Sequence, residues 1–317
     1  MRVDVEAVIT SGFIISLLAS SIRAGTPLLF ATLGEIVTER SGILNLGLEG
    51  IMITGAFTGF AVSFLTGNPW LGIVLAGFAG MVLAFVHAFF SVTLKANQSI
   101  TGLMLVLLGL GITGFFGRDY IGQVATYIDP IEIPVLSSIP VVGEIVFRHD
   151  PLVYLALFLA FVIWFLLFRT RYGLEIIASG ENPEAADSLG VDVDRIRYLS
   201  TMLGGFLVGI GGAYLSLAYA KLWTEGMTAG RGWICLALVI FSGWMPQRAI
   251  LGAYLFGGLD VLSFKLQAVG FGVSYHLLAM VPYVVTIIVL LFSMIRKREA
   301  FGAPASLGLP YIRGKRH

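Results

Sequence analysis

The chain of 317 residues is rich in apolar side chains and poor in charged ones. Charged residues make up 12% of the chain, whereas a soluble domain carries roughly 25%. Hydrophobic residues reach 57%, and the mean hydropathy is +0.90. Because so little charge cannot cover a water-facing surface, the composition excludes a pair of soluble domains and indicates an all-α polytopic membrane protein. The net charge of +1 gives no field that would favour nucleic acid as a partner.

Apolar runs with few charges predict about ten transmembrane helices, since a helix needs about 20 residues to cross a bilayer. The expected spans are 8–22, 24–37, 48–66, 70–94, 99–117, 151–168, 198–220, 232–247, 249–268 and 275–295. They form a single transmembrane domain over residues 1–317. We also expect an outer loop over about 118–150, an inner loop over about 170–197 and an inner tail over about 296–317.

The distribution of Lys and Arg orients these spans. An even number of spans puts both termini on one side of the membrane. If that side is the inner one, 14 of the 20 Lys and Arg residues lie inside and six outside. The positive-inside rule therefore predicts cytoplasmic termini.

Polar residues cluster around the second expected span and the turn after it. Glu35 and Glu39 share a helix face, and Arg40, Asn45 and Glu49 follow them. Ionisable groups at membrane depth are costly and tend to be functional. Two interpretations stay open: these residues line or gate a translocation path, or they form a cytoplasmic turn in which Glu39 and Arg40 are solvated and Glu35 is buried and paired.

Small residues recur every four positions along three spans. The three stripes are Gly55, Gly59 and Ser63; Gly72, Ala76, Gly80, Ala84 and Ala88; and Gly205, Gly209 and Ala213. Since lipid gives helices no hydrophobic reason to associate, such stripes predict close backbone packing in a compact bundle.

Signals for catalysis or for a bound cofactor do not form a pattern. Residues 109–114 match the GxGxxG spacing but lie inside an apolar span, where helix packing explains the glycines better. No GxxxxGK[ST] phosphate loop occurs, and the four histidines have no metal-ligand spacing. The sequence therefore predicts no enzyme activity, no cofactor and no metal site.

The inner loop contains a short, well-bounded helix. Residues 180–190 read GENPEAADSLG. Asn182 is suited to the N-cap, Pro183 to the first helical position and Gly190 to the position after the C-cap. We expect a helix of about seven residues outside the bilayer, which is either an ordinary solvated connection or a surface for a soluble partner.

The outer stretch 221–233, KLWTEGMTAGRGW, carries Trp223 and Trp233 on either side of Glu225 and Arg231. Tryptophans at span ends are typical interfacial anchors. The alternative is an outer gate or a surface for an extracytoplasmic partner. Further along the chain, Asp260 and Lys265 are interpreted as snorkelling charges near a membrane surface.

Two stretches carry a resemblance to a known family. Residues 31–59, ATLGEIVTERSGILNLGLEGIMITGAFTG, and residues 178–200, ASGENPEAADSLGVDVDRIRYLS, resemble permease subunits of ATP-binding cassette (ABC) importers in the superfamily of branched-chain amino acid and ribose permeases. The first stretch, together with residues 133–143, IPVLSSIPVVG, is most similar to the nucleoside branch, whose binding proteins are of the basic membrane lipoprotein type.

The resemblance implies a type II importer-like bundle in the plasma membrane of a bacterium or archaeon. Its implied partners are a second permease, often a different chain, an ATPase subunit that hydrolyses ATP, and an extracytoplasmic binding lipoprotein. In such importers the inner-loop helix docks in a groove of the ATPase. Carried over, that role falls on Gly180, Asn182, Pro183, Glu184, Ala185, Ala186 and Gly190.

The implied cargo is a nucleoside. A sugar or a branched-chain amino acid remains an alternative within the same superfamily. A proton-coupled secondary carrier is the alternative from a different class of transporter.

Overall fold

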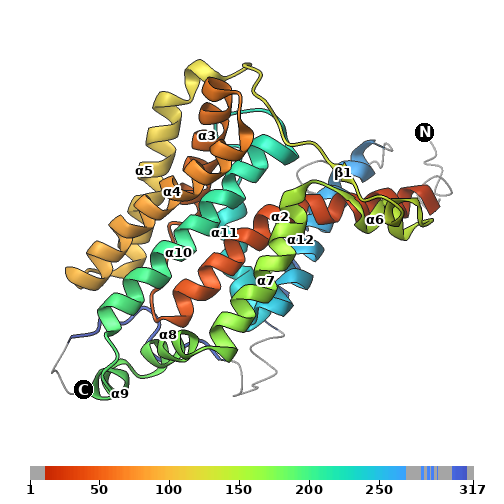
Figure 1. Cartoon of the computed structure of the whole chain (residues 1–317). Coiled ribbons are helices and arrows are strands. Elements are labelled where there is room, and N and C mark those ends of the chain that lie inside the picture. Colours follow the sequence, from red (N-terminus) through yellow and green to blue (C-terminus); the bar gives the residue numbers. More distant parts are fainter. Residues whose placement is uncertain are drawn as a thin grey trace.

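The computed structural model describes residues 11–268 and 302–312, together with a few isolated positions between 280 and 291. These residues form a bundle of long helices that run roughly side by side (Figure 1). Its helices are α2 (Ser11–Arg40), α3 (Leu48–Thr66), α4 (Pro69–Ala88), α5 (Gln98–Phe116), α7 (Pro151–Arg169), α8 (Arg171–Glu181), α9 (Pro183–Ser188), α10 (Val193–Tyr214), α11 (Arg231–Ser242) and α12 (Pro246–Ala268). The π-helical turns η1 (Phe89–Thr93) and η4 (Leu215–Tyr219) extend α4 and α10.

The connection between α5 and α7 holds the only strands among the described residues. Strands β1 (Ile131–Glu132) and β2 (Arg148–His149) pair antiparallel. The 3-10 turns η2 (Arg118–Tyr120) and η3 (Leu136–Ser138) and the short helix α6 (Val142–Val146) complete it. We call this end of the bundle the α6 end. The opposite end, made by α8, α9, residues 302–312 and the last turn of α2, is the α8–α9 end.

Seven helices in the described part of the chain are long and apolar enough to cross a membrane. The all-α, multi-pass prediction is therefore confirmed, but the count of about ten is not. Residues 11–22 of the first expected span and the whole of span 24–37 lie in one helix, α2, of 30 residues. In place of span 232–247 the structure has α11, whose 12 residues extend about 18 Å and fall short of a hydrocarbon core of about 30 Å. The expected span 275–295 lies outside the described residues, apart from isolated positions.

Side-chain caps fix where several of these helices begin. Asn68, Asn97, Asp150 and Asp192 precede α4, α5, α7 and α10, and each side chain accepts a hydrogen bond from a backbone N–H in the first turn. The first N–H groups of a helix have no partner within it, so these oxygens satisfy donors that lipid could not.

The three small-residue stripes pack against one another at the centre of the bundle. A Cβ added to Gly209 of α10 would lie 2.2 Å from the carbonyl oxygen of Ala76 in α4, and one added to Gly55 of α3 would lie 2.3 Å from that of Gly209. Gly80 of α4 likewise meets the backbone of Gly205. The prediction of close backbone packing is confirmed, and α3, α4 and α10 form what we call the glycine seam. On α5, Gly109 of the GxGxxG spacing packs against Gly50.

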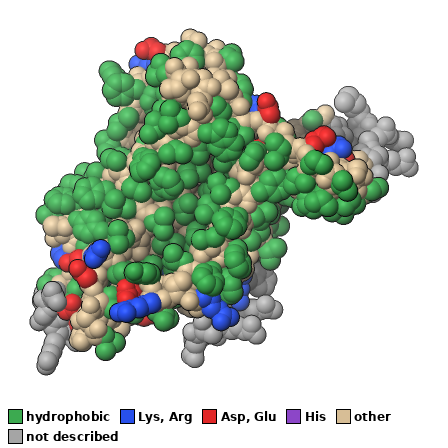
Figure 2. All heavy atoms as spheres, viewed as in Figure 1, with side chains coloured by type: hydrophobic (Ala, Val, Ile, Leu, Met, Phe, Trp, Pro, Cys, Tyr) green, Lys and Arg blue, Asp and Glu red, His purple; other side chains and the backbone are tan. Residues whose placement is uncertain are grey.

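Apolar and charged side chains divide the surface between flanks and ends. Figure 2 shows apolar side chains over the flank that faces the viewer, with charged ones gathered at its ends. Helix α5 exposes Leu103, Met104, Leu107 and Phe115 on one side, which suits contact with lipid or another apolar surface. The division agrees with a protein that spans a bilayer.

Candidate functional site

Helix α9 is a short, capped helix that projects at the α8–α9 end. The Asn182 Oδ1 accepts a hydrogen bond of 2.9 Å from the Ala185 N–H. Gly190 follows the helix with a φ of +87°, a left-handed conformation that favours glycine. The cap residues are thus those that the sequence predicted, although the helix has six residues and not seven.

The predicted coupling residues divide into an exposed set and a buried set. Asn182, Glu184, Ala185 and Gly190 are exposed, and Pro183 is half-buried. Gly180 and Ala186 are buried inside the chain. The side chain of Ala186 packs with Val193 and Tyr311, so a bulky charge placed there would disturb the permease's own packing.

Arg197, near the start of α10, ties four segments together at the α8–α9 end. Its Nε donates to the Ser41 carbonyl at 3.2 Å, and its Nη1 donates to the Leu309 carbonyl at 3.2 Å. Its Nη2 donates to the Ser179 carbonyl at 3.5 Å and to the Ser306 Oγ at 3.2 Å. Only a guanidinium offers so many donors in one plane. The sequence alone identifies Arg197 only as one of the 14 Lys and Arg residues expected on the inner side.

The last turn of α2 holds the turn between α11 and α12. The Trp244 indole N–H donates to Glu39 Oε2 at 2.6 Å. Arg40 donates through Nε and Nη2 to the Trp244 carbonyl, at 3.4 and 3.3 Å. Both charged side chains are buried, so the interpretation of a solvated Glu39 and Arg40 is wrong.

The backbone between α2 and α3 is irregular. Glu35 Oε1 accepts a hydrogen bond from the Asn45 N–H at 3.1 Å, and Asn45 Oδ1 accepts one from the Gly47 N–H at 2.9 Å. The second carboxyl oxygen of Glu35 is buried with no hydrogen-bond partner among the described residues. A buried carboxyl oxygen without a hydrogen-bond partner lowers the stability of the fold, so Glu35 is a candidate for a functional role.

Glu49, in the first turn of α3, fixes the start of α11. Its Oε1 accepts hydrogen bonds from Thr228 Oγ1 at 2.6 Å and from the Gly230 N–H at 2.9 Å. Its Oε2 accepts one from the Gly232 N–H at 2.7 Å. A carboxylate beside two helix N-termini is stabilised by both helix dipoles and by these donors.

The stretch that leads into α11 has one buried and one exposed tryptophan. Trp223 is only 1% exposed; its indole N–H donates to the Gly117 carbonyl at 2.8 Å, and its ring packs on Phe57. It is therefore not an interfacial anchor. Glu225 and Trp233 are exposed.

Two charges on α12 have partners on other helices. Arg231 Nη2 and Asp260 Oδ2 lie 2.8 Å apart, so α11 and α12 share an ion pair. Lys265 donates to Ser16 of α2. Asp260 therefore has a partner on α11 that the interpretation of a snorkelling charge did not include.

Known proteins resemble this chain over nearly its whole length. The family model described as branched-chain amino acid transport system / permease component matches residues 17–293. A putative glucose ABC transporter permease protein of Haloferax volcanii is 43% identical and covers 95% of this chain and 98% of its own length. No solved structure matches.

Two further relatives are named for nucleosides. A guanosine ABC transporter permease protein of Bacillus subtilis is 36% identical over 92% of this chain and 94% of its own length. A nucleoside ABC transporter permease protein of Lactococcus lactis is 35% identical over 94% and 97%. With a multi-pass helical bundle, these matches show that the chain belongs to the branched-chain amino acid transport system permease component family and is a permease of an ABC transporter.

Proposed function

We propose that this permease forms half of the translocation path of an ABC importer that carries a nucleoside into the cell. Helix α9 carries the proposal. It is capped at both ends, exposed on one side and tied to α2 and α10 through its neighbours, so a push on α9 reaches the helices of the bundle. An ATPase subunit that docks there supplies the energy, since the sequence has no phosphate loop of its own.

The α8–α9 end faces the cytoplasm in this proposal. Lys and Arg are concentrated in its connections, as in Lys95, Arg169, Arg171 and Arg195. Because α2 is one continuous helix, its Ser11 end lies at the α6 end, opposite residues 302–312. We therefore place the Ser11 end of α2 outside the cell. This replaces the expectation that both termini are cytoplasmic. The membrane is the plasma membrane of a bacterium or archaeon.

The path runs past the start of α11. This helix is too short to cross the bilayer, and non-helical backbone at membrane depth is tolerated only where it is buried in protein or lines a water-filled cavity. Glu225, Arg231 and Trp233 line the path in this proposal. Five buried side chains support the residues that line the path without lining it themselves. They are Glu35, Arg40, Asn45, Glu49 and Trp223.

Three kinds of subunit complete the transporter. A second permease, which is a different chain in this proposal, supplies the other half of the path. An ATPase subunit covers α9, and an extracytoplasmic binding lipoprotein delivers cargo to the α6 end.

The cargo is a nucleoside, because the guanosine and nucleoside permeases match this chain over almost all of both lengths. A monosaccharide is the second candidate, since the putative glucose permease is 43% identical. A proton-coupled secondary carrier is not favoured, because these relatives are ABC permeases.

Uptake by the reconstituted transporter tests the proposal. The ATPase, second permease and binding-protein genes are taken from the neighbourhood of this gene, and the complex is placed in liposomes. Guanosine, adenosine and glucose are then supplied with ATP. We expect ATP-dependent nucleoside uptake that survives a proton ionophore. If glucose is taken up and the nucleosides are not, the cargo is a sugar and not a nucleoside. If this chain takes up cargo without its partner subunits and the ionophore stops that uptake, the ABC proposal is wrong.

A further inference from the structure

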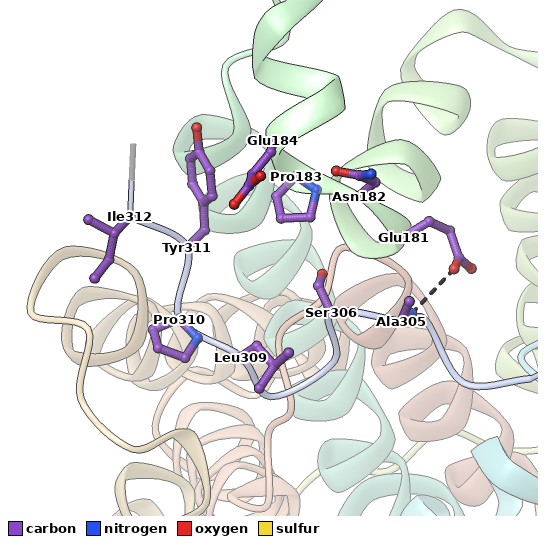
Figure 3. Close-up of a pocket in the computed structure, with 10 residues that line it drawn as sticks. All are labelled: Glu181, Asn182, Pro183, Glu184, Ala305, Ser306, Leu309, Pro310, Tyr311 and Ile312. Carbon is purple, nitrogen blue, oxygen red and sulfur yellow. Dashed lines mark hydrogen bonds between the residues drawn. The ribbon is translucent and has the colours of Figure 1, made fainter. Parts of the chain in front are cut away.

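A cleft of about 480 Å³ separates α9 from the segment 302–312 (Figure 3). One wall comes from the end of α8 and the start of α9, and the other comes from the segment. The residues that line it are Glu181, Asn182, Pro183, Glu184, Ala305, Ser306, Leu309, Pro310, Tyr311 and Ile312. The cleft therefore shares a wall with the helix that we propose as the ATPase contact.

Hydrogen bonds hold the segment in place although it is not helical. Ser306 donates from its N–H and its Oγ to the Gly180 carbonyl, at 2.8 and 2.6 Å. The Ala305 N–H donates to Glu181 Oε2 at 3.2 Å, which is the bond drawn in Figure 3. Buried Arg197 adds bonds from its guanidinium to Ser306 and Leu309. The cleft thus has two fixed walls, and its shape is set before any partner arrives.

The lining of this cleft contains both apolar side chains and carboxylates. The side chains of Leu309 and Ile312 are 57% and 41% exposed, at an end of the molecule where charged side chains also gather. Pro183 and Pro310 add apolar surface. Apolar surface beside polar groups at such an end marks a site for a protein partner. The carboxyl groups of Glu181 and Glu184 stand on the wall that Pro183 also lines, across from Leu309 and Ile312, so the complementary surface is an apolar side chain with Lys or Arg beside it.

We propose that residues 302–312 form the second half of the ATPase docking surface, and that the cleft receives an apolar side chain of the ATPase subunit flanked by basic residues. This inference rests on the proposed function, because it takes α9 as an ATPase contact. A protein that docks on α9 also covers the cleft, since the two share the wall from Glu181 to Glu184. The segment then transmits the docking force to α10 and α2 through Arg197.

Leu309→Glu tests the cleft directly. The change puts a carboxylate on the apolar wall, while the Leu309 carbonyl that Arg197 binds is unaltered. Purified complexes of this permease with its ATPase subunit provide the assay. We expect the affinity for the ATPase to fall at least tenfold while the thermal unfolding of the isolated permease stays unchanged. Val124→Glu is the matched control, because Val124 is 76% exposed at the α6 end.

A photo-crosslinking side chain at Ile312 gives a readout that does not depend on the folding of the Leu309 variant. It should join the permease to the purified ATPase subunit, and the same group at position 124 should not. Unchanged affinity of Leu309→Glu, or absence of a crosslink from position 312, would overturn the inference.

Ala185→Arg on the exposed side of α9, outside the cleft lining, separates this failure from failure of the proposed function. If Ala185→Arg weakens ATPase binding and Leu309→Glu does not, α9 is the contact and the cleft is not. If neither change weakens binding, the ATPase docks elsewhere and both proposals fail.

Discussion

The glycine seam and the α8–α9 end are held together by different means. In the seam, α3, α4 and α10 approach so closely that backbone meets backbone, as where Gly80 meets the Gly205 carbonyl. At the α8–α9 end, side chains such as Arg197 and Ser306 bridge segments that are far apart in the sequence. In lipid, close approach supplies dispersion contacts that no hydrophobic effect would provide. At the aqueous end, directed hydrogen bonds give a defined surface without a large core.

The two regions tolerate substitution differently. A Cβ added to Gly55, Gly80 or Gly209 would overlap a backbone oxygen of the neighbouring helix, so changes at these glycines act on folding. The α8–α9 end has exposed surface and a network of separate bonds, so single changes there act on the arrangement of α9 and on partners.

Gly209→Leu should have the largest effect. A Cβ at this position would lie 2.2 Å from the Ala76 carbonyl oxygen, and a backbone atom cannot move aside as a flexible side chain would. We expect little or no monodisperse protein in detergent, measured by fluorescence-detected size-exclusion chromatography. Gly111→Leu on α5 is the matched control, because nothing lies within 4 Å of its added Cβ. A well-folded Gly209→Leu protein would show that the helices of the seam can move further apart than the short distances in the structure suggest.

Glu49→Ala should destabilise the bundle less than Gly209→Leu but more than a surface change. It leaves Thr228 Oγ1 and the Gly230 and Gly232 N–H groups without an acceptor, at about 1–3 kcal/mol for each unsatisfied buried donor. Glu49→Gln keeps one acceptor oxygen and should lose less. The midpoints of thermal unfolding of the purified variants measure both effects. Equal midpoints for Ala and Gln would mean that the hydrogen bonds to Glu49 contribute little.

The seam was predictable from the sequence, whereas α2 and α11 were not. Small residues every four positions leave a local pattern that survives without knowledge of the partner helix. Arg23 looked like a break between two spans, but its Nη2 donates to the Ala218 carbonyl of η4 inside the bundle. The apolar run that contains α11 continues across the turn at Gly243 and Trp244, both with positive φ, so hydropathy alone could not show where the helix ends.

Local sequence patterns likewise predict α9 but not the segments that pack around it. The caps Asn182 and Gly190 act within a few residues and could be predicted, together with the helix they enclose. The hydrogen bond between Arg197 and Ser306 joins residues 109 positions apart, so no local sequence pattern predicts it. The exposed part of the candidate coupling surface was therefore predicted, while the segment that completes its cleft was found only in three dimensions.

Arg197→Lys should loosen the α8–α9 end while leaving the seam intact. An ammonium group cannot reach the Ser41, Ser179 and Leu309 carbonyls together, so about 1–3 kcal/mol of local stability is lost. We expect faster hydrogen exchange in residues 302–312 and α9, measured by mass spectrometry, with little change in α4 and α10. Thr201→Ser, one helical turn further along α10, is the control. Uniformly faster exchange throughout the bundle would contradict a separation between the two regions.

The Lys95–Asp194 ion pair should contribute least. Its atoms lie 3.1 Å apart, but the two side chains are 26% and 51% exposed, so water and salt screen their attraction. A double-mutant cycle of Lys95→Met and Asp194→Asn should give a coupling of about 0–1 kcal/mol, and this coupling should shrink as ionic strength rises. The Arg231–Asp260 pair, whose side chains are 16% and 35% exposed, is the comparison and should couple more strongly. A larger coupling for Lys95–Asp194 would mean that this ion pair, and not only the hydrogen bonds of Arg197, stabilises the α8–α9 end.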